Sequence, residues 1–415
     1  MATSLPPSGA AGAGSVPGGG GSAGSADVAT SSSFPPFPPE LVQVEGTARD
    51  DVLIGDADNE EMTAFRGDDV LFGGAGDDRL DGGIGDDRLE GGPGWDSYDG
   101  GPGRDTLSFH TGQTSAFVDL STGSVMLADT FEFVLEVENL TGSDFGDTLL
   151  GDDEDNVLAG GGGLDLLGGG LGDDRLDGGA DGAYATWAGQ DGAVLVDLAA
   201  GRATEWDGGV DALVDILGAV GTDHDDTLLG NGQGNRLEGG LGDDRLDGRA
   251  GDDVLVGGDG IDILIGGAGT DLVDYSGGDA VRVNLLAGEA FDESGGATDT
   301  LTGIEDVLGS LGRDTLVGDD RANRLEGSVG RDILRGNGGD DTFVFADRLD
   351  FGDTIEDFGA GDTIEVARAA VGPDGRVVFD AGGDRLLLDP GGDAALVVIA
   401  TVLGGNPSAA DVVLV

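Results

Sequence analysis

The chain has 415 residues, with 82 acidic and 20 basic side chains, a net charge of −62 and no cysteine. Such an excess of negative charge opposes compaction unless cations bind, and it excludes nucleic acid as a partner because no basic patch exists to neutralise phosphates. Hydrophobic residues make up 38% and aromatic residues 5% of the chain, which favours a thin core, and the lack of cysteine excludes disulfides and thiolate metal sites.

Residues 1–45 consist mainly of Gly, Ser, Ala and Pro and cannot build a core, so we predict a disordered linker. The first residues, MATSLPPSGAAGAG, have neither the basic nor the apolar region of a secretory signal peptide, so export would need another signal. No apolar run approaches the ~20 residues that a membrane-spanning helix needs, and we therefore expect no transmembrane segment.

From residue 73 to residue 108 the chain repeats every nine residues, as GGAGDDRLD, GGIGDDRLE, GGPGWDSYD and GGPGRDTLS. The same phase yields 22 units in four tracts, at 46–108, 142–186, 221–274 and 309–344. Position six is Asp in 17 units and Asn in three, and position eight is apolar in all 22. The strict apolar position argues against the alternative of a disordered, glycine-rich acidic tract.

The composition of this unit suits calcium. Glycines at positions one, two and four permit positive φ, so the first six residues can curl into a tight turn whose carbonyl oxygens converge. Carbonyl and carboxylate oxygens are hard donors, and without imidazole or thiolate they suit Ca²⁺ better than Mg²⁺ or a transition metal. The last three residues can form a short strand, and stacked units would bury their position-eight side chains in one thin core.

These repeats resemble those of the RTX family, also called hemolysin-type calcium-binding repeat proteins. The resemblance implies an all-β fold, a parallel β-roll with two units per turn, in which position-six aspartates and loop carbonyls hold Ca²⁺ between neighbouring turns. If each site lies between loops n and n+2 of one tract, the four tracts would bind about 14 Ca²⁺. The aspartates implied as ligands are Asp51, Asp69, Asp78, Asp87, Asp96, Asp105, Asp147, Asp165, Asp174, Asp226, Asp244, Asp253, Asp262, Asp271, Asp314, Asp332 and Asp341. The loop glycines implied at these sites are Gly74, Gly76, Gly83, Gly85, Gly92, Gly94, Gly240, Gly242, Gly258 and Gly260.

The second unit of each tract departs from the pattern in the same way: GDADNEEMT, GDDEDNVLA, GNGQGNRLE and GDDRANRLE. Position six there is Glu60, Asn156, Asn235 or Asn323, and position four carries a side chain in place of glycine. A neutral Asn oxygen attracts Ca²⁺ less than a carboxylate does, and a side chain at position four disfavours positive φ. We therefore expect weak or empty sites in these units.

Three β inserts separate the tracts, at 109–141, 187–220 and 275–308. They contain the aligned segments SAFVDLSTG, AVLVDLAAG and AVRVNLLAG. Alternation places Ala116, Val118 and Leu120 on one face and Asp119 on the other, which predicts a half-buried strand. The other two segments show the same alternation and predict the same kind of strand. We interpret the inserts as β excursions that extend the same roll. The alternative is that they present a ligand-binding surface.

After Phe343 the nonapeptides stop, and residues 345–415 contain apolar runs separated by Gly, Asp and Pro turns. We predict strands that cap the roll, because an open sheet edge invites aggregation. The chain ends in DVVLV, which resembles the uncleaved carboxy-terminal signal that type I ABC transporters read in RTX proteins. The alternative is an ordinary last strand.

The sequence predicts no catalytic residue. His110 and His224 stand 114 residues apart, so the chain lacks the HExxH zinc helix that serralysin-type proteases carry upstream of such repeats. Lysine is absent, and so is a G-x-S-x-G elbow. With 82 acidic residues a carboxylate pair acting as acid and base stays open, although loop position already explains the paired acids.

Together these features predict a secreted, extracellular and non-catalytic RTX protein that folds when Ca²⁺ binds outside the cell, where calcium modules work at ~10⁻⁴–10⁻³ M. The implied partners are calcium and a type I secretion ABC transporter. Two alternatives stay open. One is an adhesin-like scaffold that binds a glycan or a cell surface, and the other is the carboxy-terminal part of a larger toxin or enzyme.

Overall fold

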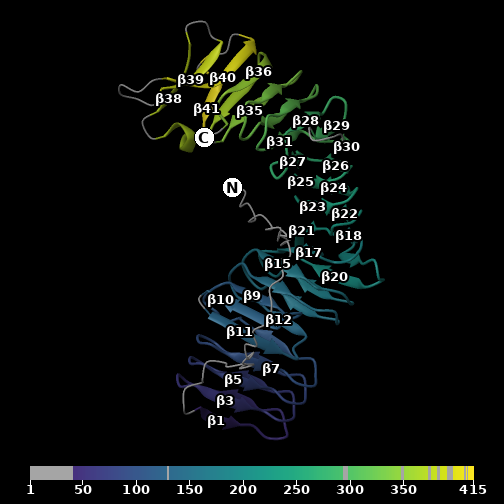
Figure 1. The fold of residues 1–415 in the computed structure, drawn as a ribbon, viewed down its shortest axis with the longest axis vertical. Coiled ribbons are helices and arrows are strands. Elements are labelled where there is room, and N and C mark those ends of the chain that lie inside the picture. The colour runs from purple at the N-terminus through teal and green to yellow at the C-terminus, as the bar shows by residue number, and fades with distance from the viewer. Residues whose placement is uncertain are drawn as a thin grey trace, which may run out of the picture. The chain divides into compact units, whose positions relative to one another are not determined.

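The computed structural model describes residues 41–128, 130–292, 298–346, 350–372, 375–380, 384–389, 396–405, 408 and 410–415. Most of the predicted linker, residues 1–40, lies outside this set. Short strands in two sheets, here named sheet A and sheet B, dominate the described residues, which also contain one four-residue helix, α1 (Arg368–Val371). Consecutive nonapeptides place their strands in opposite sheets, so two units complete one turn (Figure 1). The predicted all-β parallel β-roll is confirmed.

The first tract shows the register of the roll. Its strands are β1 (Val42–Glu45), β3 (Glu60–Thr63), β5 (Arg79–Asp81) and β7 (Ser97–Asp99) in sheet A, and β2 (Val52–Ile54), β4 (Val70–Phe72), β6 (Arg88–Glu90) and β8 (Thr106–Ser108) in sheet B. Neighbours in a sheet are parallel, and paired residues lie two units apart, as Leu53 with Leu71 and Leu80 with Tyr98. Because β1 pairs with β3, the prediction that the linker extends to residue 45 was wrong.

Position eight supplies the core. Its apolar side chain is at most 8% exposed in all 22 predicted units, as expected if that position always points between the two sheets. In β4, for example, Leu71 is buried between the half-buried Val70 and Phe72. These side chains form one continuous cluster along the stacked turns, so each unit depends on its neighbours for burial.

The first insert forms an antiparallel meander in sheet A, made of β9 (Ala116–Asp119), β10 (Ser124–Leu127) and β11 (Thr130–Leu135). Strand β11 lies parallel beside β7, and β9 lies parallel beside β13 (Thr148–Leu150) of the next tract. In sheet B, β12 (Asn139–Thr141) joins β8 to β14 (Val157–Ala159) without a break. The roll therefore continues through the insert, with three strands in sheet A where a regular turn has one.

The second and third inserts form the same meander in sheet B. Their strands are β18 (Leu195–Asp197), β19 (Arg202–Thr204) and β20 (Val210–Val214), and β28 (Val281–Asn284), β29 (Glu289–Asp292) and β30 (Thr298–Thr302). In each, the last strand pairs in parallel with the preceding tract and the first strand with the following tract. All three inserts are thus built into the sheets of the roll.

The later tracts keep the register of the first. The remaining strands of the second tract are β15 (Asp165–Gly168), β16 (Arg175–Asp177) and β17 (Ala183–Thr186). The third tract follows β21 (Ile216–Val220) and contains β22 (Thr227–Leu229), β23 (Arg236–Leu241), β24 (Arg245–Ala250), β25 (Val254–Asp259), β26 (Ile263–Ala268) and β27 (Leu272–Asp274). The fourth follows β31 (Asp306–Leu308) and contains β32 (Thr315–Val317), β33 (Arg324–Glu326), β34 (Ile333–Arg335) and β35 (Thr342–Phe345). Leu246 pairs with Leu264, and Leu325 with Phe343.

The roll does not stop at Phe343. Strand β36 (Asp353–Phe358) pairs in parallel with β34, and β37 (Thr363–Val366) with β35, and Ile355 and Ile364 are fully buried at position eight. The linked position-six residues of these turns are 21 positions apart instead of 18. Three additional residues therefore hid two further units from the nine-residue phase, and the expectation that the nonapeptides end at Phe343 was wrong.

The carboxy-terminal residues repeat the topology of the inserts. Strands β38 (Arg376–Phe379), β39 (Arg385–Asp389) and β40 (Val397–Gly404) form an antiparallel meander in sheet B, and β40 lies parallel beside β36. The last strand, β41 (Val412–Leu414), joins sheet A beside β37. This meander and β41 follow the last turn of nonapeptides and extend both sheets beyond it.

Candidate calcium sites

The loops stack with the carbonyl oxygens of one turn against the glycines of the next. A Cβ atom on Gly83 would lie 2.5 Å from the Phe65 carbonyl oxygen, and one on Gly85 would lie 1.7 Å from that of Gly67. Both glycines have positive φ, at 97° and 143°, so a larger residue does not fit. A Cβ atom on any of the ten predicted glycines would lie within 2.8 Å of a carbonyl oxygen in the loop one turn earlier. These glycines are Gly74, Gly76, Gly83, Gly85, Gly92, Gly94, Gly240, Gly242, Gly258 and Gly260.

The position-six side chains form a ladder beside these loops. One carboxylate oxygen, Oδ1, accepts a hydrogen bond from the backbone N–H of the position-six residue one turn earlier. The Asp78 N–H donates to Asp96 at 2.8 Å, and the Asp244 N–H donates to Asp262 at 2.9 Å. Among the described residues, 13 such bonds of 2.6–2.9 Å join residues 18 apart. The ladder fixes each carboxylate in place.

The second oxygen of most ladder carboxylates, Oδ2, is buried without a hydrogen-bond partner. This holds for 12 predicted ligands: Asp69, Asp78, Asp87, Asp96, Asp105, Asp165, Asp174, Asp244, Asp253, Asp262, Asp271 and Asp332. Carbonyl oxygens lie close by: the place of a Cβ on Gly82 is 2.5 Å from Asp87 Oδ2 and 2.8 Å from the Gly100 carbonyl oxygen. Asp341 also belongs to the ladder, because its Oδ1 accepts a hydrogen bond from the Asn323 N–H. Its Oδ2, however, is not among the buried oxygens without a partner.

These donors fit Ca²⁺. A buried carboxylate oxygen without a partner is unfavourable, and a hard cation is the partner that carboxylate and carbonyl oxygens satisfy together. In the described part of the chain, no group of three or more His, Asp or Glu side chains that could hold a metal gathers in one place. Backbone carbonyls would therefore supply most of the ligands at each site, which Ca²⁺ accepts more readily than transition metals do.

The first unit of each tract uses its aspartate differently. Position two of this unit is Thr or Ser, which donates hydrogen bonds to the position-six carboxylate. The Ser143 N–H donates to Asp147 Oδ2 at 2.6 Å, and the Ser143 hydroxyl lies 3.1 Å from both carboxylate oxygens. The predicted ligands with such bonds are Asp51, Asp147, Asp226 and Asp314. Because these bonds occupy the oxygen that is open elsewhere, we assign the opening aspartates to loop closure.

The second units of the last three tracts turn an amide toward the neighbouring turn. Asn156 Nδ2 donates to the Glu138 carbonyl at 2.8 Å, and Asn235 and Asn323 make the same contact at 3.0 and 2.9 Å. An N–H donor cannot coordinate a cation, which supports weak or empty sites in these units. The first tract differs because Glu60 keeps a buried, unpartnered Oε2.

Six carboxylates that the sequence analysis missed continue the ladder through the inserts and the last turn. Each accepts the backbone N–H of an earlier position-six residue at 2.7–3.2 Å, and they are Glu138, Asp211, Asp299, Glu305, Asp353 and Asp362. They lie 21 to 37 positions after their partners, so a nine-residue period could not find them. One signal was present, since Glu138 and Glu305 each stand four residues before the glycine that opens a tract.

An aromatic donor holds one buried acid in each insert. Trp187 Nε1 donates to Asp211 Oδ2 and the Tyr275 hydroxyl to Asp299 Oδ2, each at 2.9 Å. In the first insert the Tyr98 hydroxyl donates to Glu132 Oε2 at 3.0 Å. Asp211 thus has both oxygens in hydrogen bonds, and we assign it to the architecture of the insert.

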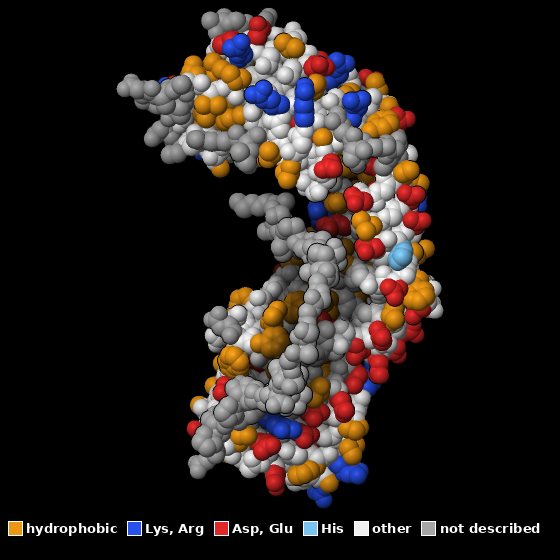
Figure 2. Space-filling view, viewed as in Figure 1, with side chains coloured by type: hydrophobic (Ala, Val, Ile, Leu, Met, Phe, Trp, Pro, Cys, Tyr) orange, Lys and Arg blue, Asp and Glu red, His pale blue; other side chains and the backbone are white. Residues whose placement is uncertain are grey.

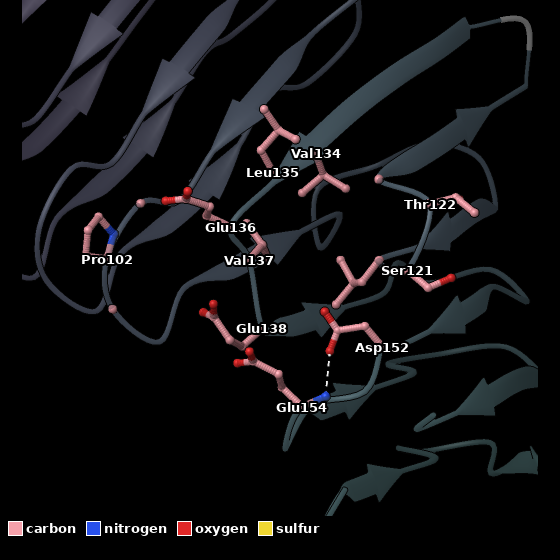
Figure 3. A pocket seen from close by; sticks show the side chains of 14 residues that line it. Pro102, Ser121, Thr122, Val134, Leu135, Glu136, Val137, Glu138, Asp152 and Glu154 are labelled. Atoms are coloured by element: carbon pink, nitrogen blue, oxygen red, sulfur yellow. Dashed lines mark hydrogen bonds between the residues drawn. The ribbon is translucent and has the colours of Figure 1, made fainter. Parts of the chain in front are cut away.

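A pocket opens where the first insert rejoins the roll (Figure 3). Four acidic side chains line it, Glu136, Glu138, Asp152 and Glu154, and Glu138 and Glu154 lie next to each other in the view. Burial raises the pKa of Glu138, and the charges of Glu154 and Asp152 add to this effect. Acidic groups therefore crowd this junction as well as the regular loops.

Burial makes the ladder carboxylates difficult to ionise without a cation. It raises the pKa of Asp96 and Asp174 to about 8 and that of Asp244 and Asp262 to about 7, and neighbouring acids contribute in each case. Figure 2 shows acidic side chains along the edge near β22, β24 and β26, whereas arginines gather near β35 and β36. The three arginines of the third tract that form ion pairs are Arg236, Arg245 and Arg249, and they pair with acids other than Asp244 and Asp262.

We expect the calcium-free chain to gain β structure when the pH is lowered from 8 to 5. In the unfolded chain the pKa of these carboxyls is about 4. Because the pKa is higher in the folded state, at about 7 to 8 for the four aspartates above, the metal-free fold loses stability as the pH rises from about 4 toward 8. Far-UV circular dichroism in calcium-depleted buffer at fixed, high ionic strength tests this while screening general charge repulsion. A β content that is constant or falls on acidification would contradict the prediction.

The comparison with protein families agrees with this geometry. The model of the RTX calcium-binding nonapeptide repeat, four copies long, matches residues 45–80, 66–89, 72–107, 141–176, 220–255, 247–281 and 308–343. The chain belongs to the RTX family. RTX repeats bind Ca²⁺, so this RTX chain is a calcium-binding β-roll protein. The matches end at residue 343, so the two shifted units in β36 and β37 escape the family model as well.

Among solved structures, the crystal structure of the extracellular lipase LipA from Serratia marcescens is similar to the RTX chain at 16% identity and a TM-score of 0.17. The similarity covers 91% of this chain and 41% of the lipase chain, so the RTX chain spans about two fifths of the length of that lipase. No curated protein matches the chain. No helix in the described residues is long and apolar enough to cross a membrane.

Proposed function

We propose that this chain is an exported, non-catalytic calcium-binding protein that stays unfolded at the low Ca²⁺ of the cell interior and folds into its β-roll outside the cell. The observation that carries the proposal is the row of buried, unpartnered carboxylate oxygens. Twelve aspartates, Glu60 and Asp353 have one each at position six, which supports about 14 bound ions. That number of Ca²⁺ would bring roughly 28 positive charges to a chain of net charge −62.

Export through a type I ABC transporter suits such a chain. Without cysteine the chain needs no disulfides, and a chain that is unfolded before it meets Ca²⁺ can pass a transporter in extended form. The terminal segment that resembles the secretion signal includes β41, which pairs with β37 in the folded roll. The transporter would therefore read this segment before folding, and the same residues would then become the last strand of sheet A.

Removing residues 367–415 is expected to abolish secretion from a host that carries a type I transporter, because the deletion takes away the signal. The truncated chain keeps every tract and both shifted units, so the purified product should still fold with Ca²⁺. Immunoblots of medium and cells measure the export. The full-length Asp253→Ala variant is the control, since it keeps the signal and should be exported. Secretion of the truncated chain at the normal level would overturn the export proposal.

A surface-binding scaffold is the second candidate function, and the first insert favours it. Its outward face exposes Met126, Phe131, Phe133 and Leu135 by 43% to 62%. The rings of Phe131 and Phe133 lie edge to face with centroids 5.1 Å apart. Exposed aromatic groups of this kind mark interaction sites for glycans or cell surfaces. The calcium-loaded protein would then sediment with its producing cells, and a Phe131→Ser/Phe133→Ser variant would not.

A further function as part of a larger toxin or enzyme would be decided by the coding region upstream of residue 1. In such a protein the roll would act as an exported carrier of a separate catalytic unit. We assign no catalytic role to His110, which stands in an insert, or to His224, which stands in a repeat loop.

A further inference from the structure

The second insert places buried oxygen atoms without partners beside the end of the second tract. Glu205, which follows β19, is 4% exposed, and its Oε2 is buried with no hydrogen-bond partner. Its Oε1 accepts a hydrogen bond from Gln190 Nε2 at 2.7 Å. Gln190 Oε1 is likewise buried and unpartnered. Two acceptor oxygens of the insert therefore lack a donor.

These oxygens meet the last regular loop of the second tract. Gln190 Nε2 also donates to the Gly170 carbonyl of that loop. The place of a Cβ on Gly209 is 2.5 Å from the Gly172 carbonyl oxygen and 2.8 Å from Glu205 Oε2, so these two oxygens flank one point. Asp174, at position six of the same unit, is 2% exposed and has a buried, unpartnered Oδ2. The charge of Glu205 contributes to the raised pKa of Asp174, as expected for two acids that lie near each other.

The topology explains why the insert supplies these groups. In a regular turn, the strand beside β16 follows a glycine loop that stacks on residues 169–174. Here β20 takes that place, and residues 205–209 come before it. Asp211 continues the ladder, but the Asp174 N–H and Trp187 Nε1 occupy its two oxygens. The open oxygens at this junction therefore belong to Glu205, Gln190 and Asp174.

We propose that Glu205 and Gln190 complete a Ca²⁺ site with Asp174 and the carbonyl oxygens of Gly170 and Gly172. The donor set consists of two carboxylates, one amide oxygen and two carbonyls, all hard oxygens of the kind that Ca²⁺ prefers. It differs from a loop-to-loop site because the insert provides two side chains in place of a second nonapeptide loop. The site ties the second insert to the end of the second tract.

The first insert provides an internal comparison. Arg202 pairs with Ala212, the residue after Asp211, as Ser124 pairs with Phe133, the residue after Glu132. Glu205 lies three residues after Arg202, and Leu127 lies three residues after Ser124, so Leu127 is the counterpart of Glu205 in the first insert. An apolar Leu127 cannot bind a cation, so the first insert lacks a ligand equivalent to Glu205.

Terbium luminescence can report on this site because two tryptophans of the insert lie beside it. Trp187 contacts Asp211, and Trp206 follows Glu205 and packs against Gly192. Trp95, in a loop of the first tract, is replaced by Phe in the parent variant so that its emission does not interfere. Bound Tb³⁺ in the parent should emit on tryptophan excitation, and Ca²⁺ should displace it.

In this parent, Glu205→Gln is expected to weaken the tryptophan-sensitised Tb³⁺ binding by roughly tenfold, because one ligand charge is lost. The control is Asp191→Asn, which removes the same charge from an exposed side chain next to Gln190 and should leave the binding unchanged. Circular dichroism at saturating Ca²⁺ confirms that each variant folds. If Glu205→Gln does not fold, Gln190→Ala, at a half-buried position, should lower the emission in the same direction. Unchanged Tb³⁺ binding in a folded Glu205→Gln or Gln190→Ala variant would overturn the proposal and assign Glu205 as a protonated acid beside the Gly172 carbonyl.

Discussion

Removal of calcium from the purified chain is expected to turn the β-roll into an expanded chain with little regular structure. Without Ca²⁺ the fold must bury 14 position-six carboxylate oxygens that have no partner, in a chain of net charge −62. The core offers little compensation, because it is thin and consists mainly of the position-eight side chains that the two sheets turn toward each other. The free energy of calcium binding thereby becomes free energy of folding. Far-UV circular dichroism and the hydrodynamic radius, measured with Ca²⁺ and with chelator, record the transition.

Magnesium at the same concentration is the control for this experiment. It supplies the same ionic charge but prefers a small octahedral shell with retained water, so it should not restore the folded state. A chelated protein with the same β content and the same hydrodynamic radius as the calcium-loaded one would show that folding is independent of calcium.

Replacing Asp253 with alanine is expected to raise the Ca²⁺ midpoint for folding far more than replacing Asn235 does. The two residues are consecutive members of one ladder, since the Asn235 N–H donates to Asp253 Oδ1 at 2.7 Å. Asp253 has an open Oδ2, whereas Asn235 donates to the Leu217 carbonyl. Asp253→Ala therefore removes a charged ligand, and Asn235→Ala removes neutral hydrogen bonds worth about 1 kcal/mol each. Calcium titrations followed by circular dichroism give both midpoints.

Asp253→Asn separates charge from shape in this pair. It keeps the side-chain length and an acceptor for the Asn235 N–H, and it imitates the side chain of the preceding turn. Its midpoint should lie close to that of Asp253→Ala if the charge is the main contribution. Equal shifts for Asp253→Ala and Asn235→Ala would show that the second units bind calcium as strongly as the interior units.

The strands and the core could be predicted because the nonapeptide repeats its chemistry in every turn. Leu246 and Leu264 belong to the same position, so one period fixes their register, their sheet and their burial. The ladder aspartates follow from the same period. The ladder members in the inserts do not, because Asp211 and Asp299 each lie 37 residues after their partners and only the pairing of strands brings them together.

The role of each ladder aspartate could not be predicted from the nine-residue period, because it depends on contacts between side chains. Asp147 and Asp165 have the same position in their units, yet Ser143 occupies the free oxygen of one and nothing occupies that of the other. Thr or Ser at position two of each opening unit was visible in the sequence, but its meaning required the distance between the two side chains. Glu205 carried no periodic signal at all, since its position matters only once β20 lies beside β16.

Because consecutive units lie in opposite sheets, the sheet that an insert joins depends on whether the number of strands since the previous insert is odd or even. The five strands β13 to β17 lie between the first and second inserts, and the meander changes from sheet A to sheet B. The six strands β22 to β27 lie between the second and third, and both of those meanders are in sheet B, as is the meander that follows the six strands β32 to β37. Gain or loss of one nonapeptide would move every later insert to the opposite side, while gain or loss of two would leave it in place. The copy number of a tract thus decides the direction in which the next insert is presented.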